Sequence, residues 1–215
     1  MDVDIWKFGF KGWLCSLILG AASITAFAAT QQKILVLGDS LSAEYGLARG
    51  MGWVALLEKK LAKEKINATV VNASISGETT SGALSRLPAL LHVQKPNLVI
   101  IELGGNDALR GMTIAQIEKN FMQLVDLSQK NGAKVLLLGM QVPPNMGPTY
   151  AREFASTYQH VVKSTKVAFV PFFLKDVADV PNARDQFQTD GIHPIATSHP
   201  TMLANVWPDL KKLLK

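Results

Sequence analysis

The chain has 215 residues, of which 48% are hydrophobic and 18% charged, with a formal net charge of +5 and a single cysteine. One cysteine excludes an internal disulfide and a metal site built on several thiolates. The basic residues are spread along the chain without interleaved aromatic residues or a known nucleic-acid-binding motif, so we expect no nucleic-acid partner.

The first 28 residues have the organisation of a secretory signal peptide. Lys7 and Lys11 form a basic start, residues 12–27 are almost uncharged and mostly apolar, and Ala26-Phe27-Ala28 supplies a small-x-small cleavage pattern. The apolar part is short and rich in small residues for a membrane-spanning helix, although an uncleaved anchor and a buried helix are the alternatives. We expect residues 29–215 to form one domain that is periplasmic or secreted.

Apolar, β-rich segments alternate with helical patterns through the rest of the chain. The expected strands are 33–38, 68–72, 97–103, 134–139 and 166–170. The expected helices are 51–65, 80–91, 113–131, 149–164 and 198–214, the last kinked or split at Pro208. This alternation predicts an α/β fold with a mostly parallel sheet and helices on both of its faces.

The first strand stops in Gly38-Asp39-Ser40, which places a hydroxyl at the carboxyl end of a buried strand. Right-handed crossovers bring every loop that follows a strand to the same edge of a parallel sheet. Gly77 follows the second strand and Asn106 follows the third, so both should lie near Ser40. A serine that only caps a helix is the alternative interpretation of Ser40.

A serine hydroxyl becomes a good nucleophile when a neighbouring base takes its proton. His193 is the best candidate because Asp190 lies three residues upstream, in the turn-like segment Asp190-Gly191-Ile192-His193-Pro194, and can orient the imidazole ring. The alternative is an aspartate that caps a turn beside a surface histidine. The other histidines, His92, His160 and His199, are expected at the surface.

Acyl transfer also needs hydrogen-bond donors for the oxyanion that develops on the substrate. Three donors are available at this edge: the backbone N–H groups of Ser40 and Gly77 and the side-chain amide of Asn106. A simple turn glycine and a helix cap are the alternative roles of Gly77 and Asn106. Asp39 and Asp107 adjoin these groups, and we expect both to brace loops by accepting backbone hydrogen bonds.

Four ordered segments resemble the conserved blocks of the SGNH (GDSL-type) hydrolases. These are Gly38-Asp39-Ser40-Leu41-Ser42, Gly77 in its Gly-Glu-Thr-Thr context, Gly104-Gly105-Asn106-Asp107 and Asp190-Gly191-Ile192-His193-Pro194. The resemblance implies a flavodoxin-like three-layer α/β/α sandwich with a five-stranded parallel sheet. It also implies Ser40, His193 and Asp190 as catalytic residues, with Ser40, Gly77 and Asn106 as the oxyanion hole.

The activity implied by this resemblance is that of a serine esterase with no cofactor and no metal. It would hydrolyse acyl esters and thioesters, such as lysophospholipids, acyl-CoA and aryl esters, through an acyl-enzyme intermediate. A carbohydrate O-acetyl esterase and a non-catalytic lipid-binding protein on the same fold are the alternatives. The small-molecule substrate is the main expected partner, and we expect a monomer.

Two apolar loops should border the site and hold an acyl chain. Leu109 and Met112 lie in the first loop, and Pro143 and Met146 lie in the second. Ordinary packing of these side chains against the sheet is the alternative. Lysine clusters at 59–65 and 211–215 favour solvated helix faces, with transient attraction to an anionic membrane surface as the alternative.

Overall fold

Five parallel strands form the sheet at the centre of the fold. The computed structural model describes Met1 and residues 31–215, so the predicted signal peptide lies, apart from Met1, outside the described residues. The strands are β1 (Gln32–Gly38), β2 (Ala68–Asn72), β3 (Leu98–Glu102), β4 (Lys134–Leu138) and β5 (Ala168–Val170). Their order across the sheet is β2-β1-β3-β4-β5, and each neighbouring pair is parallel.

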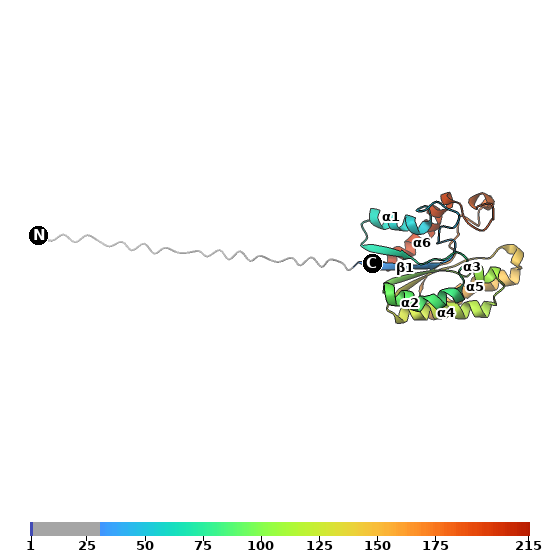
Figure 1. Cartoon of the computed structure of the whole chain (residues 1–215), viewed down its shortest axis with the longest axis horizontal. Helices are drawn as coiled ribbons and strands as arrows, with labels where there is room; N and C mark the ends of the chain where they lie inside the picture. The colour runs from blue at the N-terminus through green and yellow to red at the C-terminus, as the bar shows by residue number, and fades with distance from the viewer. Residues whose placement is uncertain (2–30) are drawn as a thin grey trace.

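Helices cover both faces of this sheet and make a three-layer sandwich (Figure 1). The helices are α1 (Trp53–Lys63), α2 (Thr80–Gln94), α3 (Gly105–Leu109), α4 (Ile114–Lys130), α5 (Pro148–Thr165) and α6 (His199–Leu213). In Figure 1, α1 and α6 lie side by side above the sheet, while α2, α4 and α5 lie below it. The predicted fold class and the five-stranded parallel sheet are therefore confirmed.

Burial on both faces explains why the central strands are almost purely apolar. All five residues of β3 are buried, and Ile34, Leu35, Val36 and Leu37 of β1 are fully buried. The helices instead carry one apolar face: in α4, Ile117, Phe121 and Leu124 recur at three- and four-residue spacing and are fully buried. The Thr113 side chain caps that helix by accepting a hydrogen bond from the N–H of Gln116.

The strand order places a topological switch point between β1 and β3. The chain leaves β1 toward α1 on one face, whereas it leaves β3 toward α4 on the other face (Figure 1). The two strands end level, because Gly38 of β1 pairs with Glu102 of β3. In open α/β sheets, ligands bind in the crevice outside the strand ends at such a point. Residues 39–42 and 103–107 therefore flank the expected site.

The last helix is present as predicted, with Pro208 inside it. Helix α6 runs unbroken from His199 to Leu213 through Pro208, so the expected split does not occur. Helix α2 likewise continues through Pro88. Packing of the apolar side chains on either side of a proline offsets the lost backbone hydrogen bond. Within residues 31–215, no helix is both long enough and apolar enough to cross a lipid bilayer.

Candidate active site

Ser40 lies in a tight turn directly after β1. The Asp39 carboxylate accepts a hydrogen bond from the N–H of Leu41 at 3.0 Å, and the Asp39 carbonyl accepts one from the N–H of Ala43 at 2.9 Å. This turn is the local reason that the strand stops, because an aspartate side chain that bonds two residues ahead replaces the next ladder bond. It leaves Ser40 half-buried, between a buried Asp39 and a buried Leu41.

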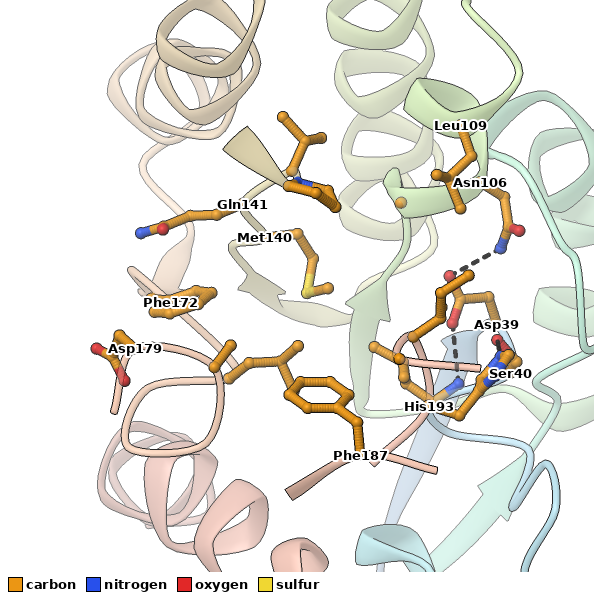
Figure 2. Close-up of a pocket in the computed structure, with 18 residues that line it drawn as sticks. Asp39, Ser40, Asn106, Leu109, Met140, Gln141, Phe172, Asp179, Phe187 and His193 are labelled. Carbon is orange, nitrogen blue, oxygen red and sulfur yellow. Dashed lines mark hydrogen bonds between the residues drawn. The ribbon is translucent and has the colours of Figure 1, made fainter. Parts of the chain in front are cut away.

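The structure brings the three predicted catalytic side chains into one hydrogen-bonded row. His193 Nε2 lies 2.9 Å from Ser40 Oγ, and His193 Nδ1 lies 2.7 Å from Asp190 Oδ2 (Figure 2). The serine and the histidine are 153 residues apart in the chain, so the fold alone makes this contact. A base bonded to a hydroxyl on one side and a carboxylate on the other is the arrangement that activates a serine.

Asp190 is held as an ionised carboxylate. Its Oδ1 accepts hydrogen bonds from the N–H groups of Ile192 at 2.8 Å and His193 at 3.0 Å. These backbone bonds and the bond from the His193 ring lower the pKa of Asp190 from 3.8 to about 2. The carboxylate therefore stays charged at neutral pH and fixes the Nδ1–H tautomer of the imidazole.

Two further residues hold His193 in place, and sequence reasoning missed both. The Tyr45 ring packs on the imidazole with ring centroids 4.2 Å apart. The Gln188 side chain donates hydrogen bonds to the carbonyls of Tyr45 at 2.9 Å and Pro194 at 3.2 Å. These bonds connect the loop that carries His193 to the turn that follows Ser40. The only available signal was proximity in the sequence, because Tyr45 lies five residues after Ser40 and Gln188 lies five residues before His193.

The three predicted oxyanion donors lie at the same edge. Among the residues that the structure describes, no acceptor takes the backbone N–H of Ser40 or of Gly77. Gly77 has a φ of +78°, a conformation that favours glycine. The Asn106 amide donates one hydrogen to Asp39 Oδ2 at 3.0 Å, which orients its nitrogen and leaves a second N–H for a ligand.

Asp107 braces the same region, as predicted. Its carboxylate accepts hydrogen bonds from the N–H and the hydroxyl of Thr80, at the start of α2 and three residues after Gly77. Arg110 adds a second connection by donating to the Gly77 carbonyl at 2.7 Å. The expected backbone bond of Asp39 is also present, to Leu41.

Asn106 sits in a short helix that the sequence analysis did not predict. Helix α3 has only five residues, and Gly104 precedes it with a φ of +106°. A Cβ atom at Gly104 would clash with the Tyr158 hydroxyl, so only glycine fits here. That hydroxyl donates to the Leu103 carbonyl at 2.8 Å and anchors the turn that presents Asn106.

A cavity of about 480 Å³ opens beside the serine. At one end it is lined by Asp39, Ser40, Asn106 and His193 (Figure 2). Its body is mainly apolar, and lined by Leu109, Met140, Val142, Pro143, Phe172, Leu174, Ala178, Phe187 and Ile192. The far end is polar, with Gln141 and Asp179 both exposed to solvent. This size and lining suit a small ligand with an apolar tail.

The four residues predicted to line an acyl groove divide into two pairs. Leu109 and Pro143 line the cavity, whereas Met112 and Met146 do not and instead pack against the hydrophobic core. Both predicted loops therefore contribute to the cavity, the second also through Gln141 and Val142, and the cavity continues from the serine toward the segment after β5. Phe172 and Leu174 follow β5, so the rule that places loops at the carboxyl edge could have found them.

The predicted surface position of His199 is wrong. It was expected at the surface but is only 2% exposed, and its Nδ1 accepts a hydrogen bond from the N–H of Trp53 at 3.0 Å. Burial lowers the pKa of His199, which keeps it neutral as this bond requires. His92 and His160 are exposed, as predicted.

Comparison with known proteins decides the family. Residues 36–199 match the model of the GDSL-like lipase/acylhydrolase family, a span that includes Ser40, Gly77, Asn106, Asp190 and His193. The chain belongs to this family. The resemblance inferred from four short blocks is therefore confirmed over most of the chain.

Relatives within the GDSL-like family carry esterase and thioesterase names. Esterase TesA of Pseudomonas aeruginosa is 53% identical over 86% of this chain and 91% of its own. Thioesterase 1/protease 1/lysophospholipase L1 of Escherichia coli K12 is 40% identical over 82% of each chain. The crystal structure of the psychrotrophic esterase EstA from Pseudoalteromonas sp., inhibited by monoethylphosphonate, superposes with a TM-score of 0.80 at 40% identity and covers 85% of this chain and 98% of that one.

These similarities, together with the family match, make this GDSL-like chain a serine ester hydrolase that acts on small-molecule esters.

Proposed function

We propose that Ser40 is the nucleophile, His193 the general base and Asp190 the residue that orients it. Ser40 Oγ forms a bond to the substrate carbonyl carbon while its proton passes to His193 Nε2. Collapse of the tetrahedral intermediate breaks the bond to the leaving group, which takes that proton and departs as an alcohol or thiol. Water then attacks the acyl-enzyme by the same route and releases the carboxylic acid. The continuous hydrogen-bonded row supports these roles.

We assign the oxyanion hole to the N–H groups of Ser40 and Gly77 and the side chain of Asn106. The observation that supports this is the set of unused donors: two backbone N–H groups have no acceptor in the described part of the chain, and Asn106 keeps one free hydrogen. A donor fixed before the reaction costs no reorganisation when charge develops on the carbonyl oxygen.

The substrate that the cavity best supports is an ester with a flexible acyl chain. The apolar lining begins beside Ser40 and continues past Phe187 to Phe172 (Figure 2). Each buried methylene contributes about 0.8 kcal/mol, so kcat/KM should rise with chain length until the cavity is filled. Because Asp179 and Gln141 leave the far end exposed, a longer chain can extend into solvent, and the gain should level off rather than reverse.

The predicted export of the protein favours a lysophospholipid or another ester over acyl-CoA, which is a cytosolic metabolite. Thioesters should still be cleaved, since a thiolate leaves more easily than an alkoxide. Surface attraction to anionic lipid is a weak contribution, because Lys60 and Lys211 both form ion pairs with Glu64. We expect the protein to act as a monomer in the periplasm or outside the cell.

A substrate panel on the purified protein tests this function. It compares p-nitrophenyl esters from C2 to C14, a lysophospholipid, an acyl-CoA and an O-acetylated sugar, with Ser40→Ala as the blank. We expect a rise in kcat/KM with chain length followed by a plateau, and cleavage of the lysophospholipid. A flat profile, or turnover of the acetylated sugar alone, would contradict it.

A further inference from the structure

Two carboxyl groups are buried side by side directly behind the proposed oxyanion hole. Glu102 is the last residue of β3 and is fully buried, and Asp39 follows β1 and is 3% exposed. Because Gly38 and Glu102 are paired across the two strands, the chain places these acids at adjacent positions. The N–H of Asp39 donates to Glu102 Oε2 at 3.4 Å, which joins the two residues directly.

The surroundings of Glu102 contain few donors for a full negative charge. Its Oε2 accepts from the Ser42 hydroxyl at 2.7 Å, and that hydroxyl in turn accepts from the indole N–H of Trp53 at 3.1 Å. No N–H or hydroxyl group donates to its Oε1 among the described residues, and the neighbouring polar side chain is the Asp39 carboxyl group. No basic side chain forms an ion pair with Glu102 in this part of the chain. A buried carboxylate without a cation is costly, and such a group takes up a proton instead.

Asp39, by contrast, is surrounded by donors. Its Oδ1 accepts from the N–H of Leu41 at 3.0 Å and its Oδ2 from the Asn106 amide at 3.0 Å. Figure 2 shows the Asp39 carboxylate beside Asn106 and close to His193 and Ser40. Holding the Asn106 nitrogen requires an acceptor, which an ionised Asp39 supplies with both oxygens.

The pKa shifts of the two acids agree with a protonated Glu102 and an ionised Asp39. Burial raises the pKa of Glu102 well above its usual range, and the charge of Asp39 raises it further. Burial also raises the pKa of Asp39, to about 6, against the lowering effect of its hydrogen bonds from Leu41, Glu102 and Asn106 and of the His193 charge. Two neighbouring acids in one buried site cannot both ionise easily, so the pair carries one negative charge at neutral pH.

We propose that Glu102 is a positioning residue that stays protonated, donates its proton toward Asp39, and so lets an ionised Asp39 hold the Asn106 amide in the orientation that the oxyanion requires. This inference rests on the proposed oxyanion role of Asn106. One negative charge on the pair is also better for catalysis than two, because a second negative charge behind the oxyanion would oppose the transition state.

Deprotonation of Glu102 should shape the alkaline side of the pH profile of kcat. When Glu102 loses its proton, the pair becomes doubly charged, Asp39 loses a donor, and kcat should fall. Among the described residues, the other ionisable groups that interact with the pair are Tyr158 from α5 and His193, and Asp107 from α3 acts in turn on Tyr158. Burial raises the pKa of Tyr158 well above its usual range, so this phenol does not titrate there first.

The test combines two variants of Glu102 with a spectroscopic readout. Glu102→Ala removes the donor and should lower kcat by roughly 10- to 100-fold with little change in KM. This is the size of effect seen when a residue that orients a metal ligand through a hydrogen bond is replaced. Glu102→Gln supplies a neutral donor of the same shape, so it should restore most of that loss at pH 7 and abolish the alkaline fall. Glu153→Gln, an exposed site on α5, is the matched control and should keep the wild-type profile.

Infrared difference spectroscopy provides a readout that does not depend on turnover. The wild-type protein at neutral pH should show the C=O stretch of a protonated carboxyl group, and Glu102→Gln should lack that band. Absence of the band in the wild type, or its persistence in Glu102→Gln, would overturn the proposal. So would an alkaline fall in Glu102→Gln equal to that of the wild type. Absence of esterase activity in the wild-type protein would instead count against the proposed function, and the infrared result would remain valid.

Discussion

Asp190 grips His193 at two points: the imidazole Nδ1 at 2.7 Å through one carboxylate oxygen, and the backbone N–H at 3.0 Å through the other. The side chain therefore fixes both the rotation of the ring and the turn that carries it. This arrangement supports the proposed division of roles, in which Asp190 orients the imidazole while Ser40 and His193 carry out the proton transfer.

Replacing Asp190 by Asn should separate catalysis from folding. An amide can present its NH₂ group to the imidazole and favour the wrong tautomer, so kcat should fall by about 10³- to 10⁴-fold. The melting temperature should change little because the site is at the surface. Steady-state kinetics and thermal melts check this, with Asp185→Asn in the same loop as control. A loss of less than about 10-fold would remove Asp190 from the proposed triad.

Replacing Asn106 by Ala should remove one oxyanion donor. The expected cost is about 10²- to 10³-fold in kcat, with KM nearly unchanged because the donor acts mainly on the transition state. Asn131→Ala, at the exposed end of α4, provides the control. An equal fall for both variants, or a change confined to KM, would argue that Asn106 is not an oxyanion donor.

The cavity predicts how chain-length preference can be altered. Ala178 lines its apolar part, so Ala178→Phe should shorten the space available to an acyl chain. Each methylene excluded costs about 0.8 kcal/mol, or roughly fourfold, so three excluded methylenes should lower kcat/KM for C12 esters by ~60-fold while C4 esters are spared. Met146→Leu, which alters a residue outside the cavity, is the comparison. A larger effect from Met146→Leu would argue that the acyl chain lies against Met146 and not in this cavity.

His199 should make stability depend on pH. Its neutral ring accepts the Trp53 N–H, and burial holds its pKa below the usual 6.5. Below pH 6.5 the unfolded chain binds a proton that the folded chain does not, so the free energy of unfolding should decrease as the pH falls toward the folded-state pKa. Above pH 6.5 this contribution is constant. Denaturant titrations from pH 5 to 8 on the wild type and His199→Asn measure this contribution. The same dependence of the unfolding free energy on pH in both proteins would contradict a neutral, buried His199.

Much of this molecule could be predicted from the sequence, because its strongest signals are local or topological. Strand 68–72 was predicted to the residue, since its β-rich run is bounded by polar residues. Parallel topology then brought Ser40, Gly77 and Asn106 to one edge without any coordinates. The pairing of Asp190 with His193 followed from a spacing of three residues in a turn.

What could not be predicted depends on packing between distant segments. Helix α3 is too short for its periodicity to be visible, and Gly104 shows its purpose only beside Tyr158. The apolar sequence of Met112 and Met146 does not reveal whether such side chains face a cavity or the core. His199 carries no local mark of burial, because its partner Trp53 lies 146 residues away.

Covalent labelling shows directly whether Ser40 is the nucleophile. The protein is treated with a fluorophosphonate at neutral pH, its intact mass is measured, and the modified peptide is sequenced. We expect one phosphonyl adduct on Ser40, absent in Ser40→Ala and retained in the exposed-site control Ser85→Ala, with the same melting temperature for all three. An unlabelled wild-type protein, or an adduct that persists in Ser40→Ala, would contradict it.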